Sequence, residues 1–282
     1  MAATHDAGRH VGYLRQVLAE GRRPLGFLLG AGCGMSVLVD GTPIVPDIAG
    51  LTAKVAERLV ANHLGDQLDK LTEFLSIRGL AAPNVEVLLT HVRLLQSIAL
   101  DQGVEGFSQV DLAGLESGIC DAIAVITDRE LPESGTPYHS LAAWAGSIER
   151  TVPVEFFTTN YDLLIEQALE RIRVPYFDGF VGARRAFLDS RAIDSFELPA
   201  RWLRLWKLHG SINWFQVGHH VTRTSESPAG ATARLIHPSH QKYDESRRMP
   251  FLAMMDRLTD FLRQPGAVLI SVGYSFGDEH LN

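Results

Sequence analysis

The stretch LGFLLGAGCG, residues 25–34, decides how the rest of the chain is interpreted. Its first half, Leu25 to Leu29, is a short apolar run, which is typical of a strand buried on both faces of a parallel sheet. Its second half, Gly30-Ala31-Gly32-Cys33-Gly34, is too rich in glycine to favour a helix and predicts a tight turn. A tight turn directly after a buried strand predicts the first βα unit of an α/β fold.

Three later apolar strands also end in polar or glycine-rich turns. Residues 153–158 lead into Thr159-Asn160-Tyr161-Asp162, residues 202–208 into His209-Gly210-Ser211, and residues 267–272 into Gly273-Tyr274-Ser275. In an open parallel sheet, ligands bind outside the carboxyl ends of the strands. The pattern therefore predicts a Rossmann-like parallel sheet whose four turns lie on one rim and face one ligand.

The sequence between the first two strands is helical in pattern. Val85, Leu88, Leu89 and Val92 follow helical spacing after the start signal Pro83-Asn84. We therefore expect a helical subdomain over residues 66–130, inserted after the first βα unit. The other helices are expected at residues 9–20, 47–63, 138–149, 163–172 and 250–263, and the polar segment 218–232 is expected to be a mobile loop.

The composition limits which classes of function are possible. The 282 residues are 46% hydrophobic, enough for one large domain or a domain with a subdomain, and the net charge of −7 without any Lys/Arg run longer than two argues against nucleic-acid binding. No apolar run approaches the ~18 residues of a membrane span, and the start of the chain lacks a signal core. Two cysteines, Cys33 and Cys120, can form neither a disulfide framework nor a four-thiolate zinc site, so a reducing cytoplasm is expected.

Each turn has a chemical interpretation and a structural one. Gly30-Ala31-Gly32 would let the backbone approach a pyrophosphate closely, or would only make a tight turn, because Met35 stands where a dinucleotide fingerprint has its third glycine. Asn160 and Asp162 could hold ribose hydroxyls and a carboxamide, or Asp162 could simply cap the next helix.

The remaining polar residues are weaker signals. His209 could accept a proton from a hydroxyl or water, or be a buried structural histidine. Asp278 could cap a following helix, and His280 and Asn282 receive no role. The spacings of His219, His220, His237 and His240 match no familiar ligand set, so no metal site is predicted.

Taken in order, GAG at residues 30–32, TTNYD at 158–162, KLHGS at 207–211 and GYSFGDEHLN at 273–282 resemble the sirtuin (silent information regulator two) family. The likeness is greatest to the bacterial sirtuin-like NAD hydrolases of anti-phage defence, and it spans residues 25–282.

The resemblance implies roles for the rim residues. Asn160 would hold the nicotinamide ribose and position the attacking group, Asp162 would bind the nicotinamide carboxamide, and His209 would act as the base; these imply Asn160 and His209 as catalytic residues. The expected NAD-binding residues are Gly30, Ala31, Gly32 and Cys33 at the phosphates, Thr159 and Asp162 at the second turn, and Gly273 and Ser275 on the adenosine side.

Several residues depart from the family pattern. Thr159 and Tyr161 replace the glutamine and isoleucine of the deacylases, and Gly34 stands where they have a serine. No cysteine follows Cys120, so the paired zinc cysteines of the deacylases are missing, and the helical block stands in place of their small domain.

The resemblance implies an NAD glycohydrolase, which uses NAD as substrate and no metal, and which depletes NAD in anti-phage defence. The alternatives are a non-catalytic NAD or ADP-ribose sensor and a sirtuin-type deacylase or ADP-ribosyltransferase; an ordinary dehydrogenase fits less well, because the first turn lacks the full fingerprint. We further expect residues 1–282 to be the N-terminal part of a longer protein, and a homo-oligomer, partner or fused domain to trigger the activity.

Overall fold

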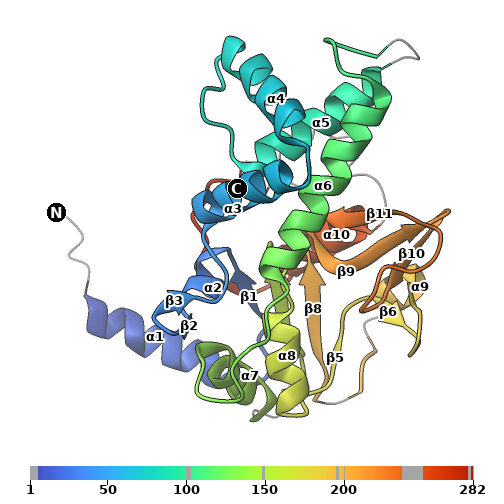
Figure 1. Cartoon of the computed structure of the whole chain (residues 1–282). Coiled ribbons are helices and arrows are strands. Elements are labelled where there is room, and N and C mark those ends of the chain that lie inside the picture. The colour runs from blue at the N-terminus through green and yellow to red at the C-terminus, as the bar shows by residue number, and fades with distance from the viewer. Residues whose placement is uncertain are drawn as a thin grey trace.

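A computed structural model describes most of the chain, and a five-stranded parallel sheet lies at its centre (Figure 1). The strands are β1 (Leu25–Leu29), β4 (Val154–Thr158), β5 (Tyr176–Phe177), β8 (Leu203–Lys207) and β12 (Val268–Val272), in the spatial order β12-β1-β4-β8-β5. All four pairings are parallel, which confirms the Rossmann-like α/β architecture. The described residues are 6–99, 103–147, 150–194, 197–199, 201–236, 250–278 and 281.

The two faces of the sheet are covered by different elements. β1, β4 and β8 are buried at every position, because side chains on both of their faces lie inside hydrophobic clusters. One face packs against helices α1 (Ala7–Ala19), α7 (Pro137–Ser147) and α8 (Leu164–Arg171). The opposite face packs against helix α10 (Phe251–Arg263), where Phe157 and Trp206 of the sheet meet Met254 and Phe261.

A second sheet, which the sequence did not predict, packs on the same side as α10. Its strands pair antiparallel in the order β11-β9-β10-β7-β6, and they are β6 (Phe180–Val181), β7 (Ala186–Leu188), β9 (Gly210–Val217), β10 (His220–Arg223) and β11 (Ala231–Ile236). The prediction of a mobile loop over residues 218–232 was therefore wrong. Gly218, at φ +59°, lies in a tight turn that leads β9 into β10, and residues 224–230 connect β10 to β11.

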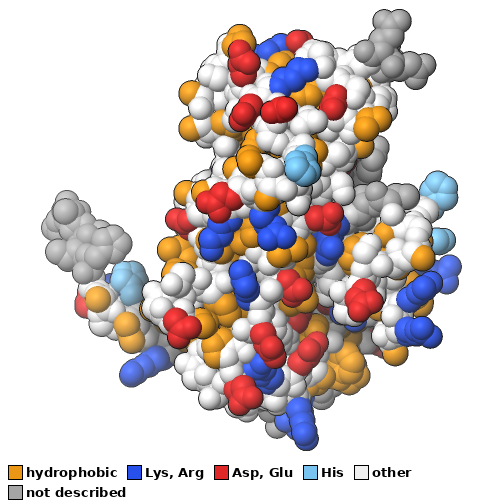
Figure 2. All heavy atoms as spheres, viewed as in Figure 1, with side chains coloured by type: hydrophobic (Ala, Val, Ile, Leu, Met, Phe, Trp, Pro, Cys, Tyr) orange, Lys and Arg blue, Asp and Glu red, His pale blue; other side chains and the backbone are white. Residues whose placement is uncertain are grey.

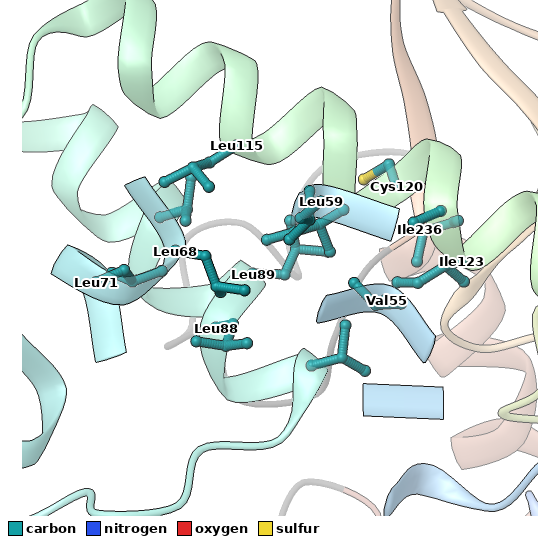
Figure 3. Packing of buried hydrophobic residues seen from close by; sticks show 14 of the residues in the cluster. Val55, Leu59, Leu68, Leu71, Leu88, Leu89, Leu115, Cys120, Ile123 and Ile236 are labelled. Carbon is teal, nitrogen blue, oxygen red and sulfur yellow. The ribbon is translucent and has the colours of Figure 1, made fainter. Parts of the chain in front are cut away.

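Four helices between β1 and β4 form a cluster of their own. α3 (Ile48–Ala61), α4 (Gly65–Ile77), α5 (Val85–Ile98) and α6 (Gln109–Thr127) share one hydrophobic core, in which Val55 and Leu59 of α3 pack with Leu68, Leu89 and Leu115 (Figure 3). The packed unit thus includes α3 as well as the expected block 66–130. In Figure 1, these helices lie above the carboxyl end of strand β8.

The small elements complete the fold. The first glycine-rich turn contains a one-turn helix, α2 (Gly32–Met35), so the expectation that it would not be helical was wrong. The hairpin β2 (Leu38–Val39) and β3 (Thr42–Pro43) follows it, and α9 (Ser190–Asp194) follows β7.

Among the described residues, no helix has the length and apolar character needed to cross a membrane. Acidic and basic side chains are intermingled over the face shown in Figure 2.

Candidate functional site

A cleft of about 460 Å³ lies at the carboxyl ends of the central strands. Its volume falls within the range of small-molecule sites, roughly 300–1,000 Å³. One wall consists of the turns after β1, β4, β8 and β12, and the other consists of the N-terminal ends of α3 and α5 from the helical cluster. The lining residues are Ala31, Gly32, Met35, Asp47, Ile48, Asn84, Glu86, Thr159, His209, Gly273, Tyr274, Ser275, Gly277 and Asp278.

The turns after β1 and β12 are pressed directly against one another. The Gly30 amide donates to the carbonyl of Val272 at 2.9 Å, and the Gly32 amide donates to the carbonyl of Gly273 at 2.9 Å. A Cβ on Gly30 would lie 2.5 Å from the carbonyl oxygen of Gly273. Glycine is therefore required here for the contact between two backbones, whatever else it does.

This contact changes how a phosphate could be held. The amides of Gly30 and Gly32 donate to β12 and the turn after it, and the amide of Cys33 donates to the carbonyl of Gly30 at 3.0 Å. Three of the amides expected to hold phosphate oxygens are thus engaged with protein carbonyls. Ala31 and Gly32 line the cleft, whereas Gly30 and Cys33 lie behind it.

Cys33 is a packing residue in this arrangement. Its Sγ lies 3.1 Å from the carbonyl oxygen of Val272, to which it donates, and the side chain is buried in the sheet's hydrophobic cluster. Burial raises the pKa of the thiol to about 11. The thiol is therefore protonated near neutral pH and is a poor nucleophile.

The turn after β4 divides its side chains between the cleft and the protein interior. Thr159 lines the cleft, but Asn160 and Asp162 are not among the lining residues. The Nδ2 of Asn160 donates to the carbonyl of Gly30 at 3.0 Å, so this side chain ties the second turn to the first. Oδ1 of Asp162 accepts from the amide of Leu164, the first residue of α8, at 3.0 Å, although the N-cap position itself is Leu163. The expectation that both side chains point toward one ligand is not met in this conformation.

Asp162 lies within a group of buried charges. Nζ of Lys207 lies 2.9 Å from Oε1 of Glu166 and also donates to the carbonyls of Tyr161 and Asp162. Burial raises the pKa of Asp162 to about 6, although the ammonium of Lys207 opposes the rise. Lys207 thus holds the backbone of the turn in place from beneath.

His209 is the ionisable residue that the turn after β8 brings to the cleft. Its side chain is buried, and Nε2 lies 3.0 Å from Oδ2 of Asp278, which is buried as well. The Nδ1 atom of the ring is buried and has no hydrogen-bond partner among the described residues. Gly210 follows at φ +86°, a conformation that favours glycine, and turns the chain directly into β9.

The last turn brings Asp278 to His209. Gly273 and Ser275 line the cleft, and the carbonyl of Asp278 accepts from Oη of Tyr274 at 3.4 Å and from the amide of Leu281 at 3.2 Å. The sequence suggested only that Asp278 could cap a following helix. A polar residue within this motif was visible, but its pairing with His209 depends on the contact between two distant turns.

The sequence also gave no sign that the helical cluster contributes to the site. Asp47 and Asn84 were visible as helix starts, and both cap their helices as expected, with Glu86 in the first turn of α5. Oη of Tyr161 donates to Oε1 of Glu86 at 3.2 Å and so connects the rim to α5. Among the described residues, three carboxylates line the cleft, those of Asp47, Glu86 and Asp278, and no Lys or Arg does.

Within the described part of the chain, no group of three or more His, Cys, Asp and Glu side chains is arranged to hold a metal ion. His219 and His220 are exposed where β9 turns into β10. His237, His240, His280 and Asn282 lie outside the described residues.

Comparison with known proteins gives one match. A family model described as a SIR2-like domain matches residues 154–282, which include the turns after β4, β8 and β12. No curated protein matches the chain. The matched segment supplies His209, Asp278 and Thr159 to the cleft, and the turn after β1 completes the same rim. Residues 154–282 therefore belong to the SIR2-like, or sirtuin-like, family, whose members are typically NAD-dependent enzymes.

Proposed function

We propose that the cleft binds NAD and that the protein hydrolyses the bond between nicotinamide and ribose, which yields nicotinamide and ADP-ribose. The observation that carries the proposal is the pairing of buried His209 with Asp278 at the cleft of a SIR2-like domain. A histidine imidazole can accept a proton from a water or a hydroxyl group.

The reaction makes modest demands on the protein. The C1′–N bond breaks, its electron pair neutralises the pyridinium nitrogen, and nicotinamide leaves uncharged. The oxygen of water bonds to C1′, and one water proton passes to His209 and then to solvent. Fixing the ribose and the water in the right geometry supplies a large part of such a rate enhancement. Carboxylates near the ribose would stabilise the positive charge that develops at C1′.

We assign the rim residues accordingly. Thr159 and Asn160 hold the nicotinamide ribose, with Asn160 reaching the ligand from its bond to Gly30. Ala31 and Gly32 approach the pyrophosphate, and Gly273 and Ser275 contact the adenosine side. Because the carboxylate of Asp162 accepts from the amide of Leu164 beneath the turn, its geometry favours a supporting role over a direct bond to the carboxamide.

The biological role that we propose is depletion of NAD in bacterial anti-phage defence, in the cytoplasm where NAD is abundant. This part of the proposal rests on the four motifs of the rim. An enzyme that destroys NAD harms its own cell, so we propose that assembly into an oligomer, or a partner or fused domain, switches it on.

The test is to incubate the protein with NAD and to measure free nicotinamide by chromatography. His209→Ala should lower the turnover by ~10²–10⁴ while it leaves NAD binding in calorimetry largely intact. Asp256→Asn is the matched control, because it removes an exposed carboxylate from α10, away from the cleft.

Two outcomes would overturn the proposal. Wild-type turnover in His209→Ala would remove this residue from the mechanism. NAD binding without release of nicotinamide, under every activating condition, would instead identify a sensor.

A further inference from the structure

Glu86 is the carboxylate that the helical cluster brings to the turn after β4. It lies in the first turn of α5, lines the cleft and is half-buried. Oη of Tyr161 donates to its Oε1 at 3.2 Å. Tyr161 stands between Asn160 and Asp162 in the chain. The side chain of Glu86 is therefore tied to the turn that we assign to the nicotinamide ribose.

Both the backbone and the side chain of Glu86 are held in place. The side chain of Asn84 accepts from the amide of Glu86 at 3.0 Å, and Oγ1 of Thr52 on α3 accepts from the amide of Val85 at 3.0 Å. Burial, together with the charge of Glu86, raises the pKa of the Tyr161 phenol well above its usual value, so the phenol keeps its proton and remains a donor. A carboxylate can accept about four hydrogen bonds, so this one leaves room for a ligand.

The other carboxylates of the cleft have different neighbours. Oδ1 of Asp47 accepts from the amide of Gly50 at 2.8 Å, and Oδ2 of Asp278 lies 3.0 Å from Nε2 of His209. Among the described residues that line the cleft there is no Lys or Arg to offset these charges. Glu86 is thus the lining carboxylate that is bonded to the turn after β4.

The charges of NAD differ between its two ends. The pyridinium ring of its nicotinamide is positive, and its two phosphates are negative. A carboxylate attracts the first and repels the second over distances of several ångströms. If the phosphates lie at Ala31 and Gly32, as proposed above, the nicotinamide end extends toward the turn after β4, where Glu86 lies.

We propose that Glu86 is a specificity-determining residue for NAD: its carboxylate attracts the positively charged nicotinamide end of the dinucleotide and keeps the phosphates toward the turn after β1. The inference rests on the proposed function, because it names the group that recognises one end of that substrate. The positive charge is present in bound NAD and passes to C1′ as the bond breaks. Glu86 therefore stabilises both states, and its loss should weaken binding more than it slows the bound substrate.

The test isolates the charge with two NAD analogues that resist hydrolysis. Carbocyclic NAD, in which a methylene group replaces the oxygen of the nicotinamide ribose ring, keeps the pyridinium cation. Benzamide adenine dinucleotide, in which carbon replaces the pyridinium nitrogen, has a neutral ring of similar shape. Calorimetry gives the Kd of each analogue for the wild-type protein and for Glu86→Gln, whose amide oxygen can still accept from Tyr161.

We expect the wild-type protein to bind the cationic analogue more tightly than the neutral one, and Glu86→Gln to reduce the ratio of the two Kd values by at least ~5-fold. Glu73→Gln is the matched control, because it makes the same chemical change at an exposed position of α4 away from the cleft, and it should leave the ratio unchanged. Equal binding of the two analogues by the wild-type protein, or the same ratio in Glu86→Gln, would overturn the inference.

Kinetics with NAD provide a second readout. Glu86→Gln should raise KM by a factor similar to its effect on the Kd of the cationic analogue, with kcat changed less. A loss confined to kcat would contradict a role in recognition of the bound substrate. Should Glu86→Gln fail to fold, the wild-type preference for the cationic analogue must still weaken as salt concentration rises, and a preference independent of salt would overturn the inference.

The two levels of proposal can fail separately. If the wild-type protein releases no nicotinamide, the proposed hydrolysis fails, and the analogues still decide whether Glu86 recognises the positive ring. If the protein hydrolyses NAD but Glu86→Gln keeps the wild-type ratio, the hydrolysis stands and the role of Glu86 falls. Binding of neither analogue would contradict both.

Discussion

Replacement of Gly273 by alanine should damage both the stability and the cleft, because two costs combine at this position. Gly273 has φ +62°, and an added Cβ would lie 2.6 Å from the backbone nitrogen of Cys33 and 2.8 Å from the carbonyl carbon of Gly32. A left-handed conformation costs a non-glycine residue roughly 1–2 kcal/mol. Overlap with a backbone that cannot move aside adds roughly 1–3 kcal/mol. The expected loss is therefore about 2–5 kcal/mol of the free energy of unfolding.

Gly266 offers a matched control in the turn before β12. Its φ is +73°, and an added Cβ would meet nothing within 4 Å. Gly266→Ala should therefore lose only the conformational part, roughly 1–2 kcal/mol. Urea unfolding followed by circular dichroism measures both losses, and unchanged m-values would show that the comparison is sound.

The same pair of variants tests the site. Gly273→Ala has to push the turn after β12 away from the turn after β1, so it should weaken NAD binding in calorimetry, whereas Gly266→Ala should not. If the two variants lose the same stability and bind NAD equally well, the close contact between these turns does not exist as described.

Four further predictions concern other parts of the rim. Asn160→Ala should reduce nicotinamide release far more than NAD affinity, because the contact with the ribose strengthens as charge develops at C1′; equal losses in kinetics and calorimetry would argue against this. Burial raises the pKa of Asp162 to about 6, above its unfolded value, so the folded state binds the extra proton and stability should fall as pH rises from about 4 to 6. Asp162→Asn, whose amide oxygen can still accept from the Leu164 amide, should remove this fall, on the order of 3 kcal/mol, in urea titrations across that range. Tyr161→Phe should lower the free energy of unfolding by roughly 0.5–1.5 kcal/mol, because it removes the hydrogen bond to Glu86. If Tyr161→Phe costs the same in a Glu86→Ala background, the loss does not come from this hydrogen bond. Treatment with a chelator should change neither thermal unfolding nor nicotinamide release, and stoichiometric zinc in elemental analysis would contradict this.

The architecture was largely predictable from the sequence. Strands buried on both faces read as continuous apolar runs, so LGFLL and VEFFT indicated β1 and β4 without knowledge of their neighbours. The polar turns then placed the ligand site, because the carboxyl ends of parallel strands share one edge. Sequence analysis therefore located the candidate site residues that lie within short continuous motifs.

Features that depend on contacts between distant segments were not predictable. Residues 218–232 are polar and looked like a loop, but pairing with β9 makes strands of 220–223 and 231–236. Pairing of backbones outweighs local composition there, as it often does in sheets. The helix starts at Asp47 and Asn84 were recognised as caps, while their place in the cleft wall follows only from how the helical cluster sits over the rim.

Side-chain direction was the least predictable property of the site. Asn160 and Asp162 are two residues apart, which in an extended segment would put both on one side. The chain instead enters α8 at Leu164, so Asp162 turns inward and accepts from the Leu164 amide, while Asn160 donates to the carbonyl of Gly30. His209 and Asp278 meet because two separate turns converge, and nothing in either motif alone indicates the pairing.

The measurement that tests the central claim most directly is the fate of isotopically labelled water. The protein is incubated with NAD in water enriched in oxygen-18, and the products are analysed by mass spectrometry, with His209→Ala as the comparison. Hydrolysis at the cleft predicts equal amounts of nicotinamide and ADP-ribose, one oxygen-18 atom in each ADP-ribose, and little of either product from His209→Ala. Unlabelled or cyclic product, product formed equally well by His209→Ala, or no product at all would contradict the account.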